Sequence, residues 1–337
     1  MKNMDWIVRP KDVESKVEEW AGTHPNLVKV ERTTQYTGHK IIAVTISEPD
    51  QLGKKRKMLA VVPHAHEPAG TAAIMNYINK LLTGHGLDGE KAEFDAKKIL
   101  SATLLTFIPI GNPDGRARSP EDYWDGTRYT NEEFWRIMHG YSSKPGFNDG
   151  IFWITHPYFD IRAEAIEVPG IVYEQISKYE YAEGNRWKKT KMYELIENLM
   201  TKYRYDQFLN LHQGMENWTE WDTWLEYPTQ SWIPRSAIDY CKLWEEAILN
   251  ELEKVGGKPN RDTGHYENFI FGPDPDKPNE RRKWLIDWIP MKYGSAELTV
   301  EVQNNNQNTP WQEQLILSEA AIKASVDFLL QKGYLNQ

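Results

Sequence analysis

The chain has very little cysteine and an excess of negative charge. Its 337 residues include one cysteine, Cys241, which excludes an intramolecular disulfide and a metal site built from several thiolates. Any bound metal ion must therefore use histidines and carboxylates as ligands. Lysine and arginine number 40 against 49 aspartates and glutamates, for a net charge of −9. This acidic balance argues against nucleic acid as a partner.

Long apolar runs are also missing from the sequence. No stretch approaches the ~18 apolar residues of a membrane span. The opening residues, MKNMDWIVRPKD, carry charges where a signal peptide needs an apolar core. We therefore expect no membrane partner and a cytoplasmic location, although a processed secreted form would look the same. The hydrophobic content of 40% is enough for one large core, so we expect residues 1–337 to form a single domain.

Strand patterns alternate with helical patterns along the chain. Apolar runs typical of strands occupy 57–63, 99–115 and 296–302, helical periodicity covers 11–21, 71–84, 236–257 and 309–333, and 191–214 combines a helix with a strand. Thr71 is the predicted N-cap of the second helix and Gly84 its stop. This alternation predicts a mostly parallel sheet covered on both faces.

Two segments lack any periodic pattern. Residues 116–170 and 256–282 are rich in proline, glycine, aspartate and aromatics, so we expect long loops there. In open α/β sheets such loops surround the carboxyl ends of the strands, where ligands bind. The tryptophan-rich stretch 218–232 is interpreted either as aromatic core or as a loop that lines a substrate groove.

Histidines and a glutamate follow two of the predicted strands. The run LAVVPHAHEPAG places His64 and Glu67 three residues apart directly after a strand, and NLHQG places His212 at the end of another. Two imidazoles and one carboxylate suit Zn²⁺, and such a set leaves a position open for water. Zinc lowers the pKa of bound water to about 7, which suits hydrolysis of amides or esters. The neighbouring His66 allows an alternative, in which His64 and His66 bind the metal and Glu67 supports them.

Hydrolysis by a zinc site also needs a carboxylate that takes a proton from water. The strand AELTVEV offers two, Glu301 and Glu297, four residues apart on one face. We expect Glu301 to be the general base, with Glu297 as its competitor.

Four short motifs, in order, resemble the zinc carboxypeptidases of the carboxypeptidase A type. They are HAHEPAG, GNPDG (111–115), LHQG and LTVEV, and the opening helix and hairpin also look like those of the family. The resemblance covers most of residues 11–332. It implies a three-layer α/β/α sandwich around a mixed, mostly parallel eight-stranded sheet. It also implies that one Zn²⁺ is bound by His64, Glu67 and His212, that Glu301 is the general base, and that His66 is not a ligand.

The resemblance also points to substrate-binding residues. Family members bind the terminal carboxylate of the substrate with an Asn-Arg pair, and Asn185 and Arg186 form such a pair here. Arg128 is the candidate for the arginine that polarises the scissile carbonyl, and Arg116 is the alternative.

The sequence departs from the family pattern at the substrate pocket. Asn279 stands where the family places a tyrosine over the substrate, and Tyr266 is the predicted replacement. The family's specificity segment corresponds to IDW. Ile286 predicts a pocket that tolerates apolar residues, whereas Asp287 predicts one that receives a basic group.

The sequence is therefore compatible with three functions, two catalytic and one of binding only. The first is a zinc metallocarboxypeptidase that hydrolyses the C-terminal peptide bond. The second is a zinc-dependent deacylase or amidase that acts on a small N-acyl or cell-wall peptide substrate. The third is a non-catalytic protein that binds a peptide or glycan.

Overall fold

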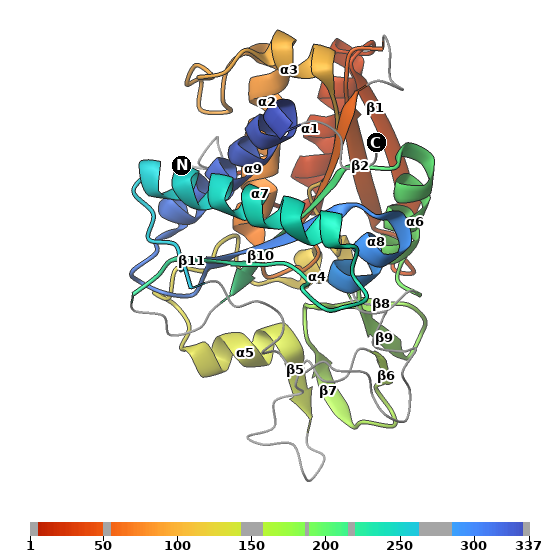
Figure 1. The fold of residues 1–337 in the computed structure, drawn as a ribbon. Helices are drawn as coiled ribbons and strands as arrows, with labels where there is room; N and C mark the ends of the chain where they lie inside the picture. The colour runs from red at the N-terminus through yellow and green to blue at the C-terminus, as the bar shows by residue number, and fades with distance from the viewer. Residues whose placement is uncertain are drawn as a thin grey trace.

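The computed structural model describes residues 6–49, 55–142, 158–185, 189–214, 220–262 and 285–332. Figure 1 shows a central sheet flanked by long helices, with a group of smaller elements at one end of it. No helix within the described ranges is long and apolar enough to cross a membrane.

The central sheet is mixed, and its four middle strands are parallel. Its strand order is β1-β2-β4-β3-β10-β12-β11. The strands β4, β3, β10 and β12 run parallel, whereas β1, β2 and β11 pair antiparallel at the two sides. Their bounds are β1 Val28–Thr34, β2 Lys40–Ile46, β3 Arg56–Val61, β4 Thr103–Ile108, β10 Gln207–Gly214, β11 Thr223–Glu226 and β12 Ala296–Gln303. The described residues contribute seven strands, so the predicted eighth strand is not confirmed.

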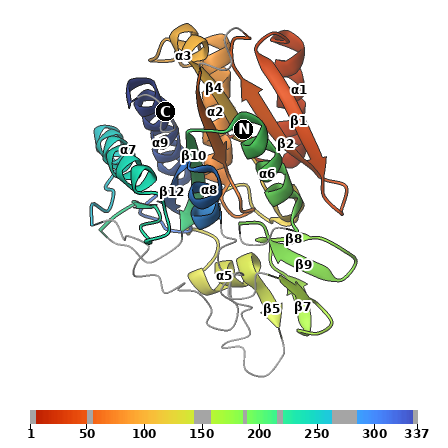
Figure 2. The ribbon, with the colours of Figure 1, turned by 45° about the vertical axis from the view of Figure 1, so that its right-hand side comes forward.

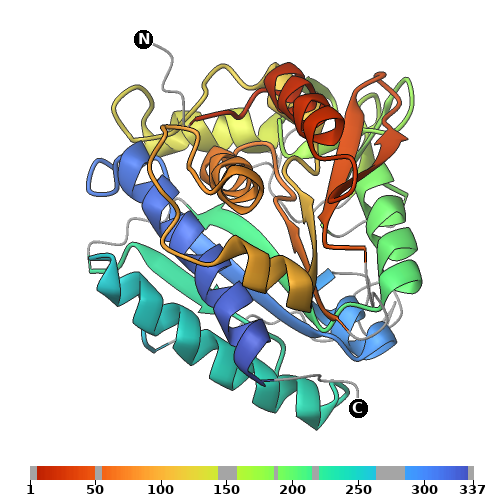
Figure 3. The same ribbon diagram turned by 90° about the horizontal axis from the view of Figure 1, so that it is seen from above.

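Helices cover both faces of this sheet, which confirms the three-layer α/β/α architecture (Figures 2 and 3). The larger core contains apolar residues of α1 Pro10–Thr23, α2 Pro68–Thr83, α3 Ala96–Ala102, α7 Arg235–Lys254 and α9 Trp311–Lys332. The smaller core on the opposite face contains residues of α6 Lys191–Tyr203 and α8 Leu285–Tyr293. Alternation along β12 directs Leu298 and Val300 into the larger core and Glu301 to the other face.

The carboxyl ends of three adjacent parallel strands bring the motif residues together. Strand β3 pairs with β10, and β10 pairs with β12. His64 follows the end of β3, His212 lies near the end of β10, and Glu301 lies near the end of β12. Polar side chains far apart in the sequence therefore meet at one edge of the sheet.

The segment 116–170, predicted to be long loops, contains regular structure. Helix α5 (Asn131–His139) begins with a capping box in which the Thr130 and Glu133 side chains each bond the other's backbone N–H. This helix is 9 residues long, too short for its periodicity to stand out from the segment around it. The segment also contains the end of α4 Pro113–Arg118 and the strands β5 Gly140–Ser142, β6 Tyr158–Asp160 and β7 Ile166–Pro169. Two further short strands, β8 Tyr173–Gln175 and β9 Glu180–Glu183, follow it.

A separate small apolar core holds these elements below the edge of the main sheet. It contains Trp124, Phe134 and Tyr173 and reaches Ala65, inside the loop that follows β3. The predicted loop 256–282 falls mostly outside the described residues, which end at 262 and resume at 285.

Helix α2 begins three residues before the predicted N-cap. Pro68 occupies its first turn, and the Thr71 hydroxyl instead donates to the carbonyl of Pro109 at 2.7 Å. Proline at this position costs no hydrogen bond, because the first N–H groups of a helix have no intrahelical acceptor. The predicted stop is confirmed, since Gly84 is the C-cap with a positive φ of 77°. The helix therefore starts directly after Glu67.

Candidate metal centre

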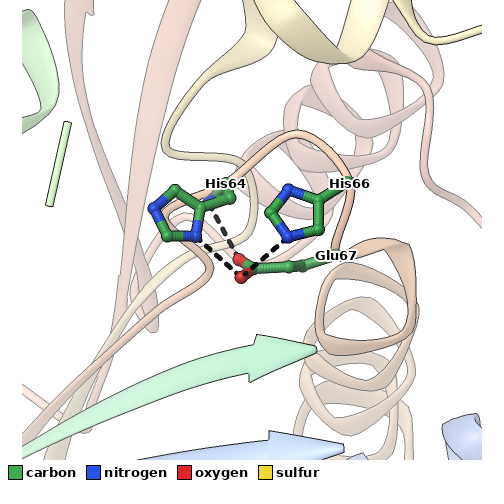
Figure 4. A group of neighbouring side chains, drawn as sticks. All are labelled: His64, His66 and Glu67. Carbon is green, nitrogen blue, oxygen red and sulfur yellow. Dashed lines mark hydrogen bonds and ion pairs between the residues drawn. The ribbon is translucent and has the colours of Figure 1, made fainter. Parts of the chain in front are cut away.

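The loop between β3 and α2 folds the Glu67 side chain back onto His64. The Glu67 carboxylate accepts a hydrogen bond from the backbone N–H of His64 at 2.9 Å and lies 2.8 Å from its ring Nδ1 (Figure 4). Helix α2 approaches the sheet closely here, because a Cβ on Gly70 would lie 2.9 Å from a methyl group of Val62. The close approach fixes the start of α2, and with it Glu67, at the end of β3.

His212 reaches the same carboxylate from the neighbouring strand. Its Nδ1 lies 2.9 Å from Oε1 of Glu67, the oxygen that also faces Nδ1 of His64. All three side chains are buried, with exposed fractions of 7% for His64, 1% for Glu67 and 6% for His212. The structure thus brings two imidazole nitrogens to one carboxylate oxygen. This set of donors fits a borderline divalent cation such as Zn²⁺.

The charged forms of the acidic and basic groups in this cluster stabilise one another. Burial raises the pKa of Glu67, but His212 and His64 outweigh this effect and hold the pKa well below its usual value. Burial lowers the pKa of His64, but the carboxylates of Glu67 and Glu183 outweigh it and raise that pKa to about 10. In the absence of a metal the cluster therefore contains a carboxylate and a protonated imidazole, and a divalent cation would replace that proton.

Glu183 is a member of the site that the sequence did not reveal. It lies at the end of β9, and its Oε1 is 2.6 Å from Nε2 of His64. The same oxygen accepts the backbone N–H of Asn185 at 2.8 Å. A carboxylate on the second imidazole nitrogen fixes the ring and leaves Nδ1 to face a metal. The only sequence signal was proximity, because Glu183 stands two residues before Asn185 in a segment without periodicity.

His66 lies beside the cluster and keeps the alternative ligand set open. One donor atom from each of His64, His66 and Glu67 lies within 4.8 Å of the others. However, Nε2 of His66 is 3.7 Å from the Glu67 carboxylate (Figure 4). The Nδ1 atoms of His64 and His212 lie closer to that carboxylate, at 2.8 and 2.9 Å. Burial lowers the pKa of His66 to about 3, so this imidazole is neutral.

Glu301 faces the cluster from β12. It is the direct register partner of His212, and its Oε1 lies 3.9 Å from Nδ1 of that histidine. Its side chain is 23% exposed, so it is open to solvent on one side. Desolvation raises the pKa of Glu301 to about 8, and Glu67 adds to the effect. The competitor Glu297 is fully buried opposite Phe208, near the beginning of both strands.

The two candidate arginines lie in different surroundings. The side chain of Arg128 is 60% exposed and forms an ion pair of 2.5 Å with Glu121. Arg116, on α4, is fully buried, and none of its side-chain nitrogens has a hydrogen-bond partner among the described residues. Burial lowers the pKa of Arg116 to about 9, while the Glu67 carboxylate opposes that change. Of the two arginines, Arg116 is therefore the buried one whose charge interacts with the Glu67 carboxylate.

The predicted substrate-binding residues are only partly described. Asn185 is nearly buried, and its carbonyl accepts the backbone N–H of Leu285, which places the first turn of α8 beside it. Ile286 is buried in that turn, at 2% exposure. Arg186, Tyr266, Asn279 and the side chain of Asp287 lie outside the described residues.

Comparison with known proteins identifies a matching family and similar folds. The family model described as zinc carboxypeptidase matches residues 13–327. No curated protein shows significant sequence similarity to the chain. Similar solved structures include a metallo-carboxypeptidase from Burkholderia cenocepacia, with a TM-score of 0.59 and 11% identity over 96% of this chain and 70% of that one. Carboxypeptidase A from Helicoverpa armigera gives a TM-score of 0.59 and 15% identity over 98% and 75%.

A third similar structure contains an inhibitor. Bovine thrombin-activatable fibrinolysis inhibitor in complex with tick carboxypeptidase inhibitor gives a TM-score of 0.58 and 10% identity, over 98% of this chain and 99% of that one. At such low identities, these likenesses show a shared fold.

Proposed function

Because the chain belongs to the zinc carboxypeptidase family, we propose that it is a zinc-dependent peptidase that hydrolyses the C-terminal peptide bond of peptides. The observation that carries this proposal is the meeting of His64, Glu67 and His212, with Nδ1 atoms 2.8 and 2.9 Å from one carboxylate oxygen. Glu301 beside them completes the groups that hydrolysis requires.

The metal ligands in this proposal are Nδ1 of His64, Nδ1 of His212 and the carboxylate of Glu67. The three donors lie in the short loop after β3, on β10 and at the residue that caps the start of α2. Zinc bound there supplies a Lewis acid and lowers the pKa of water to about 7. Glu183 holds the His64 ring so that Nδ1 faces the ion.

Glu301 acts as general base and then as general acid. It accepts a proton from the attacking water and delivers it to the leaving amine. Burial raises the pKa of Glu301 to about 8, so its ionised form is a stronger base than an ordinary carboxylate. A divalent cation bound by His64, Glu67 and His212 would favour that ionised form. Because the side chain is partly exposed, substrate and water can reach it.

An arginine stabilises the negative charge that develops on the scissile carbonyl oxygen. We assign this role to Arg116, whose buried guanidinium has donors free of partners among the described residues. Arg128, which the sequence favours, instead forms an ion pair with Glu121 at the surface. The charge of a buried guanidinium is screened little by water, so its effect on the oxyanion is large.

Recognition of the free C-terminus completes the proposal. Asn185 is within two residues of Glu183 and next to α8, so it lies at the edge of the proposed zinc site. With Arg186 it would bind the terminal carboxylate, since a guanidinium matches a carboxylate with two hydrogen bonds. Ile286, Asp287 and Tyr266 are the proposed residues of the side-chain pocket.

The test combines metal analysis with matched peptide substrates. The purified protein should contain about one zinc per chain, and a chelator should abolish activity that added zinc restores. Peptides with a free C-terminus should be cleaved, whereas the same peptides with a C-terminal amide should not. Cleavage of both, or of small N-acyl substrates only, would replace this proposal with a deacylase or amidase. Bound zinc without any hydrolysis would indicate a binding protein.

A further inference from the structure

Two polar loops form a cleft, and one of them follows the strand that carries Glu301. Residues 126–131 and 305–308 line a space of about 520 Å³. The second loop continues the strand that carries Glu301, and the preceding Asn304 donates from its side chain to the carbonyl of His66 at 3.1 Å. Asn304 thus lies between the loop of the metal ligands and the cleft, so a peptide substrate that runs past Asn304 would reach the cleft.

Carboxamide groups dominate the lining of the cleft. It is lined by the amide side chains Asn131, Asn305, Asn306, Gln307 and Asn308, together with Thr127, Thr130 and Tyr129. The two charged side chains that line it have partners, since Arg128 pairs with Glu121 and Glu133 accepts from the backbone of Thr130. The lining is therefore polar and close to neutral, which distinguishes it from a pocket for an apolar or strongly charged ligand.

The walls of the cleft are held together by backbone contacts. Gly126 has a φ of 73°, and a Cβ there would lie 2.9 Å from the carbonyl oxygen of Asn305. Asn305 has a φ of 47°, and its N–H donates to the carbonyl of Trp124 at 3.0 Å. Its side chain donates to Tyr129 and Asn131 on the opposite wall. The cleft is thus formed in advance, which reduces the entropy lost when a ligand binds.

We propose that this cleft is a subsite for a neutral sugar carried by the peptide substrate. A carboxamide offers two donors and one acceptor side by side, and a sugar hydroxyl is itself both donor and acceptor. The Asn305 amide nitrogen and one N–H of Gln307 already donate within the wall, which leaves the side chain of Asn308, the amide nitrogen of Asn306 and the remaining groups of Gln307 for a ligand. Tyr129, partly buried, adds an aromatic surface for the apolar face of a sugar ring. Extended peptides are instead bound along a strand edge or by apolar pockets, and the residues of this cleft belong to loops and the first turn of α5.

The proposal rests on the proposed function in one respect. A carboxypeptidase removes the last residue, so the rest of the peptide stays outside the zinc site and can carry a sugar near the rim. Sugar binding itself requires neither zinc nor hydrolysis. The two proposals can therefore fail separately.

The first experiment measures binding of N-acetylglucosamine and glucose by saturation-transfer NMR, with glycerol as the control for simple hydroxyl binding. The test variants Gln307→Leu and Asn308→Leu each remove one carboxamide from the cleft. The control variant Gln312→Leu removes an exposed carboxamide on α9, outside the cleft. Melting temperatures of all variants establish that they fold. Saturation transfer from protein to sugar, lost in the test variants and retained in the control, supports the proposal.

The second experiment compares peptides of one sequence, with or without a single O-linked N-acetylglucosamine at successive positions before the last residue. We expect kcat/KM to rise about tenfold for one position, as one or two added hydrogen bonds would give. The two cleft variants should lose this gain and keep their activity on the plain peptide. No sugar binding and equal kcat/KM at every position would overturn the proposal. A gain from lengthening the plain peptide, abolished by the same variants, would replace the sugar with peptide backbone.

Discussion

His212 and Glu301 are direct register partners on the adjacent parallel strands β10 and β12, with Nδ1 and Oε1 3.9 Å apart. In the proposed function, His212 binds the metal and Glu301 takes a proton from water beside it. The sheet itself sets their separation, so neither role depends on a flexible loop.

Glu301→Gln tests the proposed base. The amide keeps the shape of the side chain but cannot accept the proton, so kcat should fall by about 10²- to 10⁴-fold. Zinc content and melting temperature should stay near those of the unchanged protein. Glu297→Gln is the matched control on the same strand face, and its kcat should remain within a few-fold. Equal losses from both substitutions would contradict the assignment.

Substitution of the two arginines separates their roles. Arg116→Gln should lower kcat/KM by about 10²- to 10³-fold, the usual cost of removing one oxyanion donor. Arg128→Gln breaks an exposed ion pair and should change kcat/KM little. Steady-state kinetics on one free peptide measures both, and urea unfolding shows whether Arg116→Gln still folds. Loss of activity with Arg128→Gln alone would return the role to Arg128.

Glu183 is expected to act through His64. Glu183→Gln keeps the volume of the side chain but removes the negative charge that faces Nε2 of His64. Zinc affinity should therefore fall about 10- to 100-fold. Competition with a metal chelator of known affinity measures this change. Saturating zinc should restore most of the activity, which a simple loss of folding would not allow. Unchanged affinity would show that Glu183 does not orient the ring.

Titration of Glu174, which lies outside the proposed metal site, should make the stability of the fold depend on pH. Burial raises the pKa of this carboxyl on β8 to about 7, although the backbone N–H of Lys191 donates to it. The folded state therefore holds a proton that the unfolded state loses above its normal pKa of about 4.3. Stability should fall as pH rises from about 4.5 to 7, by up to about 3 kcal/mol. Glu174→Gln should remove this fall, and urea unfolding at pH 5 and pH 8 measures it. An unchanged pH dependence in the variant would contradict the shift.

The part of the site that followed strands could be predicted from the sequence. His64, His212 and Glu301 each stand at the end of a recognisable apolar run, and parallel strands bring their ends to one edge. The order of the motifs also predicts the zinc carboxypeptidase family and, through it, the three-layer fold. The family match confirms both predictions.

Contacts from irregular segments could not be predicted in the same way. Glu183 reaches His64 across 119 residues from a short strand without a periodic pattern. Spacing along the chain favours Arg128 over Arg116 but carries no information on burial. Arg116 is buried because α4 packs against the loop after β3, where a Cβ on Gly115 would lie 2.8 Å from Ala65. Threonine is a good N-cap in isolation, so the sequence predicts a cap at Thr71, whereas in the structure α2 begins at Pro68.

The location of the metal tests the central claim most directly. Anomalous diffraction at the zinc edge, on crystals of the protein grown with zinc, shows which side chains bind the ion. We predict one zinc bound by Nδ1 of His64, Nδ1 of His212 and the carboxylate of Glu67, at about 2.0–2.2 Å, with Glu301 beside it but not bound. Zinc bound by His64 and His66 with His212 turned away, or no zinc at this edge of the sheet, would contradict it.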